Sequence, residues 1–311
     1  MKTCNKTNTA QNSDNAKMKI RATIRRYIFF FVILFIPLAQ FCIFYVGTNI
    51  NTIVMSFQKY DNGVFIGNGW KNYEEFFSML STDIRLVSAL KNSFIQYLAT
   101  LIISMPLSII IAYYLYVKIP ATGFFKVMLM IPQLISSMVF VCIFKYLFND
   151  GIIPLFGWKA NIYWVAPTQF QIMLFYQLFF GLAGHLVLYL GAMANIDQSV
   201  MEYGDIDGLG TLGKLWHIVL PGIYPTIVVF MMTGFAGFFT NQGPLYSFYA
   251  NTAHNESYTL GYWMFLLVHD TSKTPYEYPL ASTAGVVFTA IAAPLVLLFR
   301  NLLERFGPRE D

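Results

Sequence analysis

The stretch from Glu202 to Pro221, EYGDIDGLGTLGKLWHIVLP, decides the fold because it is a polar, acidic, glycine-containing insert between two long apolar runs. The rest of the chain is far more hydrophobic than a soluble domain. Of its 311 residues, 56% are hydrophobic and only 12% are charged, whereas charged residues make up about 25% of a typical soluble domain. These values are typical of a polytopic membrane protein. In such a protein, the insert must lie in water on one side of the membrane.

Six apolar runs are long enough, or nearly so, to cross a bilayer core, which takes about 20 helical residues. The predicted fold is therefore all-α and polytopic, with six transmembrane helices and a short helix in the insert between spans four and five. The predicted spans are Tyr27–Val46 (with an amphipathic extension to Phe57), Phe94–Val117, Phe124–Phe148, Phe170–Met193, Ile223–Phe239 and Leu280–Phe299. The fifth span is the shortest, and it breaks at Asn241-Gln242-Gly243-Pro244.

The distribution of Lys and Arg predicts the orientation of the spans. Six spans place both termini on one side of the membrane, and that side carries thirteen of the twenty Lys and Arg residues. We therefore expect both termini in the cytoplasm, together with residues 195–221, which we call the connector. The basic residues are concentrated near the two ends of the chain, so they indicate orientation and not nucleic-acid binding.

Five parts follow from these predictions. We expect a basic, disordered cytoplasmic tail at 1–26, the first helix and its extension at 27–57, an extracellular loop at 58–93, a five-helix core with the connector at 94–300, and a cytoplasmic tail at 301–311. The outward loops contain four of the five tryptophans. These rings serve either as interfacial anchors or as a docking surface for an external partner.

The connector itself shows a helix–turn–helix pattern. Glu202–Ile206 predicts a short helix with its acids near the N-terminus, where the helix dipole favours them. Asp207-Gly208 predicts a turn. A helical pattern resumes from Leu212, and one face of it carries Leu212, Leu215, Trp216 and Val219. Composition alone allows either an ordinary interfacial connector or a contact surface for a partner.

Several classes of function lack their residues in this chain. Gly208 to Lys214 matches the first part of a phosphate-binding P-loop, but Leu215 stands where a Ser or Thr is needed for magnesium. Three nearby carboxylates would also repel phosphate, so we expect no nucleotide on this chain. The three scattered cysteines give neither a disulfide framework nor a metal site. No HExxH, GxSxG or paired intramembrane aspartates indicate catalytic residues.

The connector resembles the cytoplasmic signature of binding-protein-dependent ABC importer permeases. The matching residues are Glu202, Ile206-Asp207-Gly208, Lys214, Ile218 and Leu220-Pro221. Most of the chain beyond residue 25 is similar to the carbohydrate-uptake class, the maltose and glycerol-phosphate type. The motifs that carry this similarity are Trp70-Lys71-Asn72-Tyr73, Ala89-Leu90-Lys91-Asn92-Ser93 and Ile131-Pro132. The departures are Tyr203, Gly204 and Leu209 in place of alanines, and Leu215 where an aromatic residue is usual.

This resemblance implies that the chain is a non-enzymatic transport subunit of a bacterial plasma membrane. The implied partners are a second permease subunit (as a heterodimer), two ATPase subunits, an extracellular sugar-binding lipoprotein, a sugar substrate and membrane lipid. ATP and magnesium would bind to the ATPase, and no cofactor to this chain. The implied ATPase-coupling residues are Glu202, Tyr203, Gly204, Asp205, Asp207 and Gly208.

Within the coupling set, we expect Glu202 to pair with a basic residue of the ATPase. Asp207 either contacts the ATPase directly or only forms the turn. Leu212, Leu215 and Trp216 are expected to pack the connector on its own membrane helices. The changes at Tyr203 and Gly204 predict a partner surface that differs from those of relatives.

The substrate path is expected among polar groups at membrane depth, which are costly there unless they face a cavity or a partner. The candidates are Gln96, Gln133, Gln177, His185, Asn241 and Gln242. Neutral amides with many aromatic rings suit a sugar, although a helix–helix hydrogen bond is the alternative role for each candidate. His185 fits a packed, hydrogen-bonded histidine better than a ligand. Asn241-Gln242 is the leading candidate, because interrupted helices line binding sites.

Three alternatives to sugar import remain. The same mechanism would serve another small polar solute. An ion-coupled secondary transporter would be expected to carry ionisable residues within its spans, and the spans here contain almost none beyond Lys145 and His185. An intramembrane enzyme would need a paired catalytic constellation, which the sequence does not contain.

Overall fold

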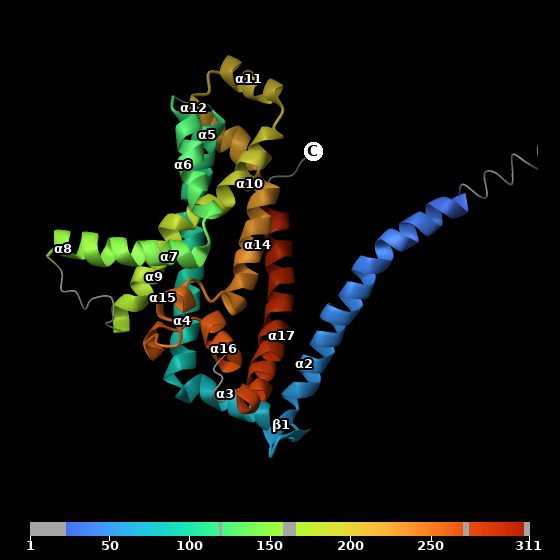
Figure 1. Ribbon diagram of the computed structural model, residues 1–311. Helices are drawn as coiled ribbons and strands as arrows, with labels where there is room; N and C mark the ends of the chain where they lie inside the picture. The colour runs from blue at the N-terminus through green and yellow to red at the C-terminus, as the bar shows by residue number, and fades with distance from the viewer. Residues whose placement is uncertain (1–22, 118–119, 158–165, 270–273, 308–311) are drawn as a thin grey trace, which may run out of the picture. The chain divides into compact units, whose positions relative to one another are not determined.

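A computed structural model describes residues 23–117, 120–157, 166–269 and 274–307 (Figure 1). The chain divides into two compact units, Met1–Met55 and Ser56–Asp311. The predicted first span is confirmed, because a helix of 34 residues runs from Thr23 to Ser56. It includes the π-helical stretch η1 (Phe41–Gly47) and α2 (Thr48–Ser56). Its large apolar side chains are exposed, as expected for a helix whose surroundings are lipid.

The second unit is almost entirely helical. It opens with a two-stranded antiparallel hairpin, β1 (Gln58–Asp61) and β2 (Val64–Gly67). The helical elements after the hairpin are α3 (Lys71–Thr82), α4 (Ile84–Ala99), η2 (Thr100–Ser104), α5 (Met105–Tyr116), α6 (Thr122–Leu134), α7 (Ser137–Tyr146), η3 (Leu147–Ile152), α8 (Ile153–Leu155), α9 (Ala166–Phe180), α10 (Leu182–Ala194), α11 (Gln198–Ile206), α12 (Thr211–Lys214), η5 (Leu215–Val219), α13 (Leu220–Gly222), α14 (Tyr224–Thr240), α15 (Leu245–Tyr249), η6 (Asn255–Ser257), α16 (Leu260–His269) and α17 (Thr274–Phe306).

The prediction of an all-α polytopic fold is confirmed. Within the described ranges, five helices are long and apolar enough to cross a membrane. The sixth would be formed by the bent pair 211–222 and 224–240, whose two parts meet at 68°. The fifth predicted span ends as expected, because α14 stops at Thr240 and Asn241 takes an extended conformation.

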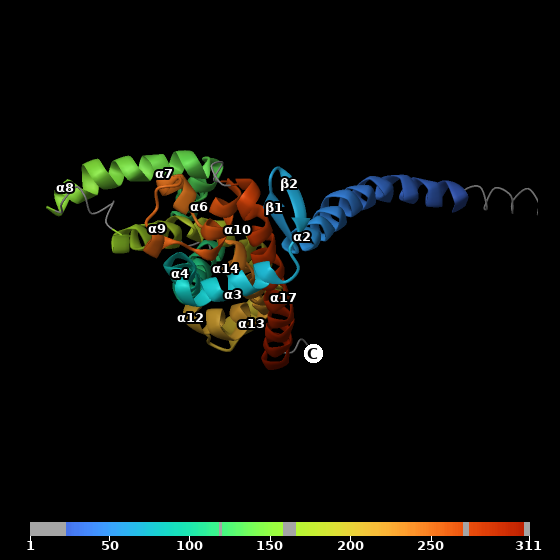
Figure 2. The ribbon, with the colours of Figure 1, turned by 90° about the horizontal axis from the view of Figure 1, so that it is seen from below.

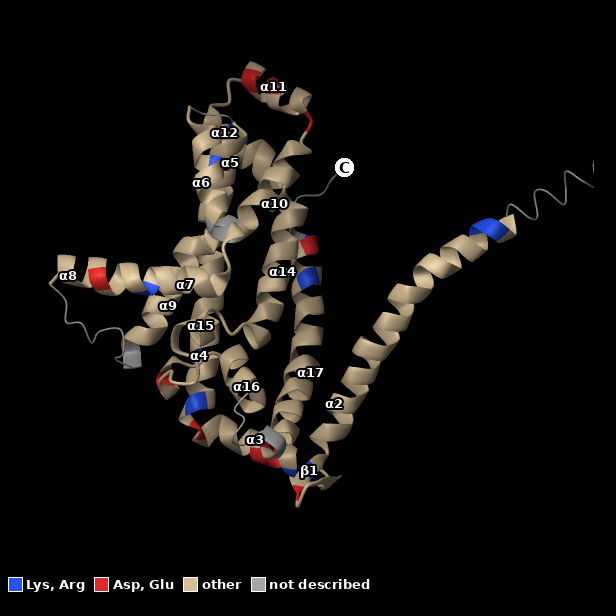
Figure 3. Ribbon diagram, viewed as in Figure 1, with Lys and Arg blue, Asp and Glu red and all other residues tan. Residues whose placement is uncertain are grey.

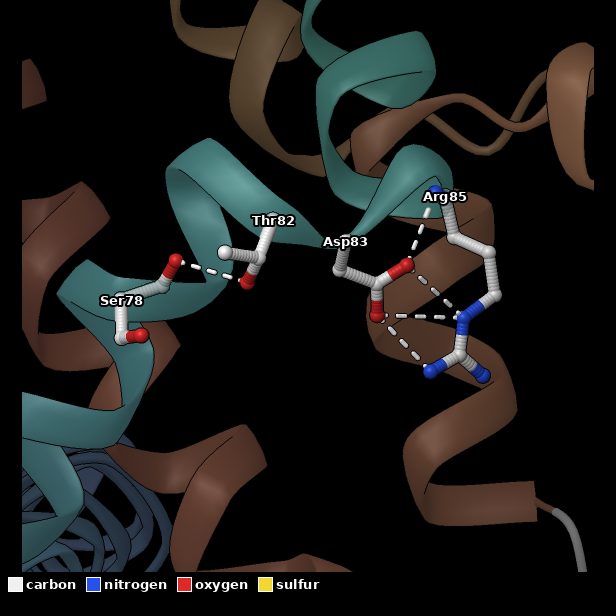
Figure 4. A network of polar contacts seen from close by, with 4 residues as sticks. All are labelled: Ser78, Thr82, Asp83 and Arg85. Carbon is white, nitrogen blue, oxygen red and sulfur yellow. Dashed lines mark hydrogen bonds and ion pairs between the residues drawn. The ribbon is translucent and has the colours of Figure 1, made fainter.

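The second span is longer than predicted, because helix α4 begins at Ile84 and not near Phe94. Asp83 fixes this start: its carboxylate accepts a hydrogen bond of 2.8 Å from the backbone N–H of Arg85 and pairs with the Arg85 guanidinium at 2.8 Å (Figure 4). An Asp at this position satisfies backbone donors that the first helical turn leaves open. The cap lies in a polar stretch, which a search for apolar runs does not detect.

The third predicted span, Phe124–Phe148, is not one continuous helix. It breaks at Ile135 and Ser136, whose backbones are extended, with ψ of 138° and 133°. Helices α6 and α7 consequently run in different directions (Figure 1 and Figure 2). Apolarity alone does not distinguish a continuous helix from two joined ones, so the sequence pattern missed this break.

Charged residues are unevenly placed in the second unit. Lys, Arg, Asp and Glu lie on the connector, the hairpin, α3 and several helix ends including that of α17, whereas α9, α10, α14 and α16 carry none (Figure 3). The uncharged helices contribute to two buried apolar clusters, one around Trp263 and Phe248, and the other around Tyr189 and Val219. A charge-free stretch of helix between polar ends is what a membrane-spanning bundle requires.

Two short motifs found in the sequence hold the chain at its turns. Asn72 donates from Nδ2 to the carbonyl oxygens of Ser56 and Gln58, at 2.8 and 2.7 Å. Asn92 donates from Nδ2 to the carbonyl oxygens of Glu256 and Tyr258, at 2.8 and 2.9 Å. These amides satisfy backbone carbonyls on the neighbouring segments. The motifs therefore fix the hairpin onto α3 and the segment before α16 onto α4.

Candidate functional site

A cavity of about 510 Å³ lies between α4, η2, α9, α10 and α14. Four of the predicted substrate-path residues line it: Gln96, Gln177, His185 and Asn241. None of the described lining residues is Lys, Arg, Asp or Glu. The described lining can therefore offer hydrogen bonds and aromatic faces to a ligand, but no charged Lys, Arg, Asp or Glu side chain.

Gln96 and Gln177 are joined across the cavity wall. Gln96, which is buried, donates from Nε2 to Oε1 of Gln177 at 2.6 Å, linking α4 to α9. The helix–helix hydrogen bond that the sequence left open as an alternative is thus present, and both residues also line the cavity. A paired amide of this kind keeps its remaining polar atoms in a fixed orientation.

The break after α14 packs directly against this pair. Asn241 accepts a hydrogen bond from the backbone N–H of Gly243 at 2.8 Å, which closes a tight turn. Gly243 has φ of +59°, and a Cβ atom there would lie 3.1 Å from Nε2 of Gln96 and 3.3 Å from Oε1 of Gln177. The glycine is therefore needed both for its backbone conformation and for its small size.

Gln242 and Gln133 are not placed in the cavity lining, and His185 lies in the lining as a packed ring. Gln242 does not line the cavity; its Oε1 is buried without a hydrogen-bond partner among the described residues. Gln133 belongs to α6, but its side chain lies outside the described part of the structure. His185 packs edge-on against Phe230, with ring centroids 4.7 Å apart, which agrees with the expected packing; the hydrogen bond expected with it stays a prediction.

The sequence reasoning missed several lining residues, among them Tyr97, Thr100, Tyr189 and Thr233. Their spacing was a usable signal. Ser93, Gln96, Tyr97 and Thr100 recur at the interval of one helical face. A search for polar residues at helical spacing, instead of for isolated amides, would have found this wall of the cavity.

The connector forms the predicted helix, turn and helix at one end of the second unit (Figure 1). Helix α11 begins earlier than expected, because Asp197 caps it by accepting from the backbone N–H of Ser199 at 3.0 Å. This backbone hydrogen bond, together with one from the Ser199 side chain, lowers the pKa of Asp197. The prediction that Glu202 and Asp205 lie near the helix N-terminus is therefore wrong: Glu202 is the middle residue of α11 and Asp205 is the last but one.

The predicted turn at Asp207-Gly208 is confirmed. Gly208 has φ of +74°, a left-handed conformation that glycine adopts without steric cost. Across this turn, Asp205 forms an ion pair with Lys214. The oxygen of the Glu202 side chain accepts from Nε2 of Gln198 at 3.0 Å on the same helix. The turn thus folds α11 back onto the helical stretch that begins at Thr211.

Gly204 lies at the contact between the two halves of the connector. It is buried, and a Cβ atom there would lie 2.7 Å from Cδ1 of Ile218. The absence of a side chain at Gly204 lets α11 approach η5 closely. One of the residues that departs from the signature pattern thus packs inside the chain.

The apolar stripe of the connector is divided between inside and outside. Leu215 and Val219 are buried against α5 and α10, so the packing expected for Leu215 is confirmed. Leu212 and Trp216 are 80% and 69% exposed, and the expectation that they pack on the chain's own helices is wrong. The buried face of this helical stretch is centred on residues 215 and 219. The side chains of Leu212 and Trp216 therefore point away from α5 and α10.

The described helices are those of a multi-pass membrane protein. A family model described as "binding-protein-dependent transport system inner membrane component" matches residues 104–311. The chain belongs to this family, and the resemblance found in the sequence is confirmed.

Curated relatives match along most of the chain. The multiple sugar-binding transport system permease protein MsmF of Streptococcus mutans is 25% identical over 301 residues, which covers 93% of this chain and 99% of that protein. The polygalacturonan/rhamnogalacturonan transport system permease protein YteP of Bacillus subtilis is 26% identical over 265 residues, which covers 82% and 81%.

Solved structures share the fold. A bacterial ABC transporter involved in the import of the acidic polysaccharide alginate contains a chain that matches with a TM-score of 0.72 and 18% identity, covering 93% of this chain and 100% of that one. The same transporter type in complex with an alginate pentasaccharide-bound periplasmic protein matches with a TM-score of 0.71. At this identity the similarity concerns the fold alone.

Proposed function

We propose that this chain is a permease subunit of an ABC importer that takes up an uncharged sugar or oligosaccharide. An extracellular binding lipoprotein delivers the sugar, and ATP hydrolysis on two separate ATPase subunits drives the import. The observation that carries the proposal is the cavity beside the α14 break, with its uncharged amide, hydroxyl and aromatic lining.

The lining suits a sugar on chemical grounds. Its volume of about 510 Å³ falls within the range of roughly 300–1,000 Å³ typical of small-molecule sites. Gln177 and Asn241 offer amides for hydroxyl groups, and Tyr97 and Phe238 offer aromatic surface. The described lining has no Lys or Arg to neutralise an acidic sugar, which favours an uncharged one over a substrate such as alginate. The printed names of the relatives refer to sugars and polysaccharides.

The partners follow from the family and from the composition of this chain. The sequence has no complete P-loop, which supports ATP hydrolysis on a separate subunit as the family implies. A second permease subunit would complete the path as a heterodimer, and the related alginate transporter was solved with a periplasmic binding protein. ATP and magnesium would bind to the ATPase subunits.

The connector is the element that receives the movement of the ATPase. In the proposed orientation, both termini and the connector lie in the cytoplasm of a bacterial cell. The coupling residues are Glu202, Tyr203, Gly204, Asp205, Asp207 and Gly208. In this set Glu202 pairs with a basic residue of the ATPase, and Gly204 and Gly208 set the shape of the connector.

A transport assay on the assembled complex tests the function. The chain is purified with its partner permease and ATPase, placed in liposomes, and supplied with sugar-loaded binding protein and ATP. We expect Asn241→Ala to reduce sugar uptake at least tenfold, because Asn241 lines the cavity, and Asn251→Ala, in an exposed loop, to leave uptake unchanged. Equal uptake by both variants would contradict the assignment of this cavity. Uptake of a different polar solute in the same assay would replace the sugar as substrate.

A further inference from the structure

The second half of the connector is held by more of the chain than the two spans it joins. Leu215, Val219 and Ile223 are buried in one cluster with Ile109 and Tyr113 of α5 and with residues of α10. Only α10 and α14 are its neighbours in sequence. Movement of the connector can therefore reach α5 through this packing contact, although α5 is not joined to the connector in sequence.

Tyr113 makes this contact specific. Its ring is 5% exposed, and its hydroxyl donates to the carbonyl oxygen of Thr211 at 2.7 Å. Thr211 is the first residue of the connector's second helical stretch. A buried phenol that finds a backbone acceptor in this way ties the end of α5 to a defined point of the connector.

Tyr224 makes a second tie at the opposite end of the same stretch. It follows Ile223, the residue at which the connector bends into α14. Its hydroxyl donates to the carbonyl oxygen of Leu303 at 2.9 Å. Leu303 lies in the last turn of α17, where the backbone carbonyls have no hydrogen-bond donor within the helix. Gly307 lies so close to the Tyr224 ring that a Cβ atom would overlap it.

We propose that Tyr113 and Tyr224 are positioning residues that pass movement of the connector directly to α5 and α17. This inference rests on the proposed function, because it assigns a role in ATP-driven transport. Movement of the stretch 211–222 then shifts four membrane helices: α10 and α14 through the chain, and α5 and α17 through the two hydroxyls. Helices α10 and α14 line one side of the cavity, and α4 and η2, which continue into α5, line another. These helices therefore move together.

The two hydroxyls act on coupling and not on folding alone. One hydrogen bond of this kind shifts an equilibrium about fivefold. When a hydroxyl is lost, the ATPase still moves the connector, but the linked helix no longer follows it in every cycle. Sugar moved per ATP hydrolysed then falls, whereas the rate of ATP hydrolysis does not fall in proportion.

The test compares Tyr113→Phe and Tyr224→Phe with Tyr262→Phe. Tyr262 is a matched control, because its hydroxyl also donates to a backbone carbonyl, that of Ala250, far from the connector in sequence and outside the cavity. We expect each of the first two variants to lower the sugar-to-ATP ratio about fivefold, and the control to retain the wild-type ratio.

A second readout uses spin labels at Val200 of α11 and Leu302 of α17, which are 43% and 44% exposed, with the native cysteines replaced by alanine. Their distance distribution is expected to be narrow with and without ATP, and to broaden in Tyr224→Phe.

The outcomes separate this inference from the proposed function. ATP-driven sugar uptake by the wild-type complex supports the function whatever the variants do. A wild-type sugar-to-ATP ratio in both Phe variants, or a lowered melting temperature with an unchanged ratio, would overturn the role of the tyrosines and leave the function standing. Absence of ATP-driven uptake in the wild type would overturn both.

Discussion

Gly243, at the break after α14, gives the sharpest test of how the cavity wall is built. We expect Gly243→Ala to destabilise the chain and to impair transport, for two reasons that add. The residue has φ of +59°, and its missing Cβ leaves room for the amides of Gln96 and Gln177. Gly69→Ala is the matched control, because Gly69 has φ of +62° but no atom within 4 Å of where its Cβ would lie.

The size of the effect follows from these surroundings. A left-handed backbone conformation costs a residue with a Cβ roughly 1–2 kcal/mol, and this cost applies to both variants. At Gly243, the new Cβ would also meet Sδ of Met173 at 3.2 Å and the two amide atoms at 3.1 and 3.3 Å. Crowding of a packed site costs typically about 1–3 kcal/mol. Gly243→Ala should therefore cost about 2 kcal/mol more than Gly69→Ala.

Melting temperatures of the purified chain in detergent, and sugar uptake by the assembled complex, measure the two effects. We expect Gly243→Ala to melt several degrees below Gly69→Ala and to raise the KM for uptake, because the amide pair on the cavity wall is displaced. Equal melting temperatures would show that the break does not pack on Gln96 and Gln177. A lower melting temperature with unchanged KM would remove this pair from the substrate path.

Three further predictions concern the helix start at Asp83 and the connector. Desolvation opposes ionisation of Asp83, but its hydrogen bonds and ion pair with Arg85 outweigh this and lower its pKa. Because the folded-state pKa is depressed, the stabilisation is present above the unfolded value of about 3.9 and is lost as the pH falls through the folded value. Asp83→Ala should thus lower the free energy of unfolding by about 1 kcal/mol at pH 7 and by less below pH ~3.9. A difference in melting temperature between wild type and variant that is constant from pH 7 to pH 3 would be evidence against this cap. The Cβ of Gly204→Ala would meet Cδ1 of Ile218 at 2.7 Å, which offsets the gain of about 1 kcal/mol in helix propensity. Gly204→Ala should therefore raise the melting temperature more in an Ile218→Val background, which lacks Cδ1, than in the wild type; the same change in both backgrounds would argue against the contact. Trp216→Ala should change stability by less than about 0.5 kcal/mol yet weaken capture of the ATPase several-fold; a large loss of stability with normal capture would mean that Trp216 packs on its own chain.

The sequence predicted the parts of the fold that depend on apolar length and on turn chemistry. Apolar runs located the membrane helices, although the third run is broken and the second helix starts earlier than predicted. Asn241 to Pro244 placed the end of α14, and Asp207-Gly208 placed the turn of the connector. Each of these signals is local: a run of about 20 apolar residues or a glycine that favours a left-handed backbone. Four of the six candidate path residues line the cavity, because polar side chains at membrane depth are costly unless they face a cavity or a partner.

The features that the sequence did not predict depend on tertiary contacts or on short caps. The break between α6 and α7 lies in an apolar run without a distinct signal at Ile135. Trp216 and Leu215 are neighbours in the apolar stripe, and only the position of α5 and α10 decides which of them is buried. Gly204 was expected to alter the surface offered to a partner, whereas it is buried at the contact with Ile218. The tie from Tyr224 to Leu303 joins residues 79 positions apart.

The central claim is that ATP, hydrolysed by partner subunits, drives sugar through this chain. The most direct measurement is the initial rate of sugar uptake into liposomes that contain the complete complex and sugar-loaded binding protein, with and without ATP at the connector side. The account predicts uptake that requires ATP, persists when proton and sodium gradients are abolished, and is lost with a hydrolysis-deficient ATPase. Uptake that continues without ATP and follows an ion gradient would contradict it.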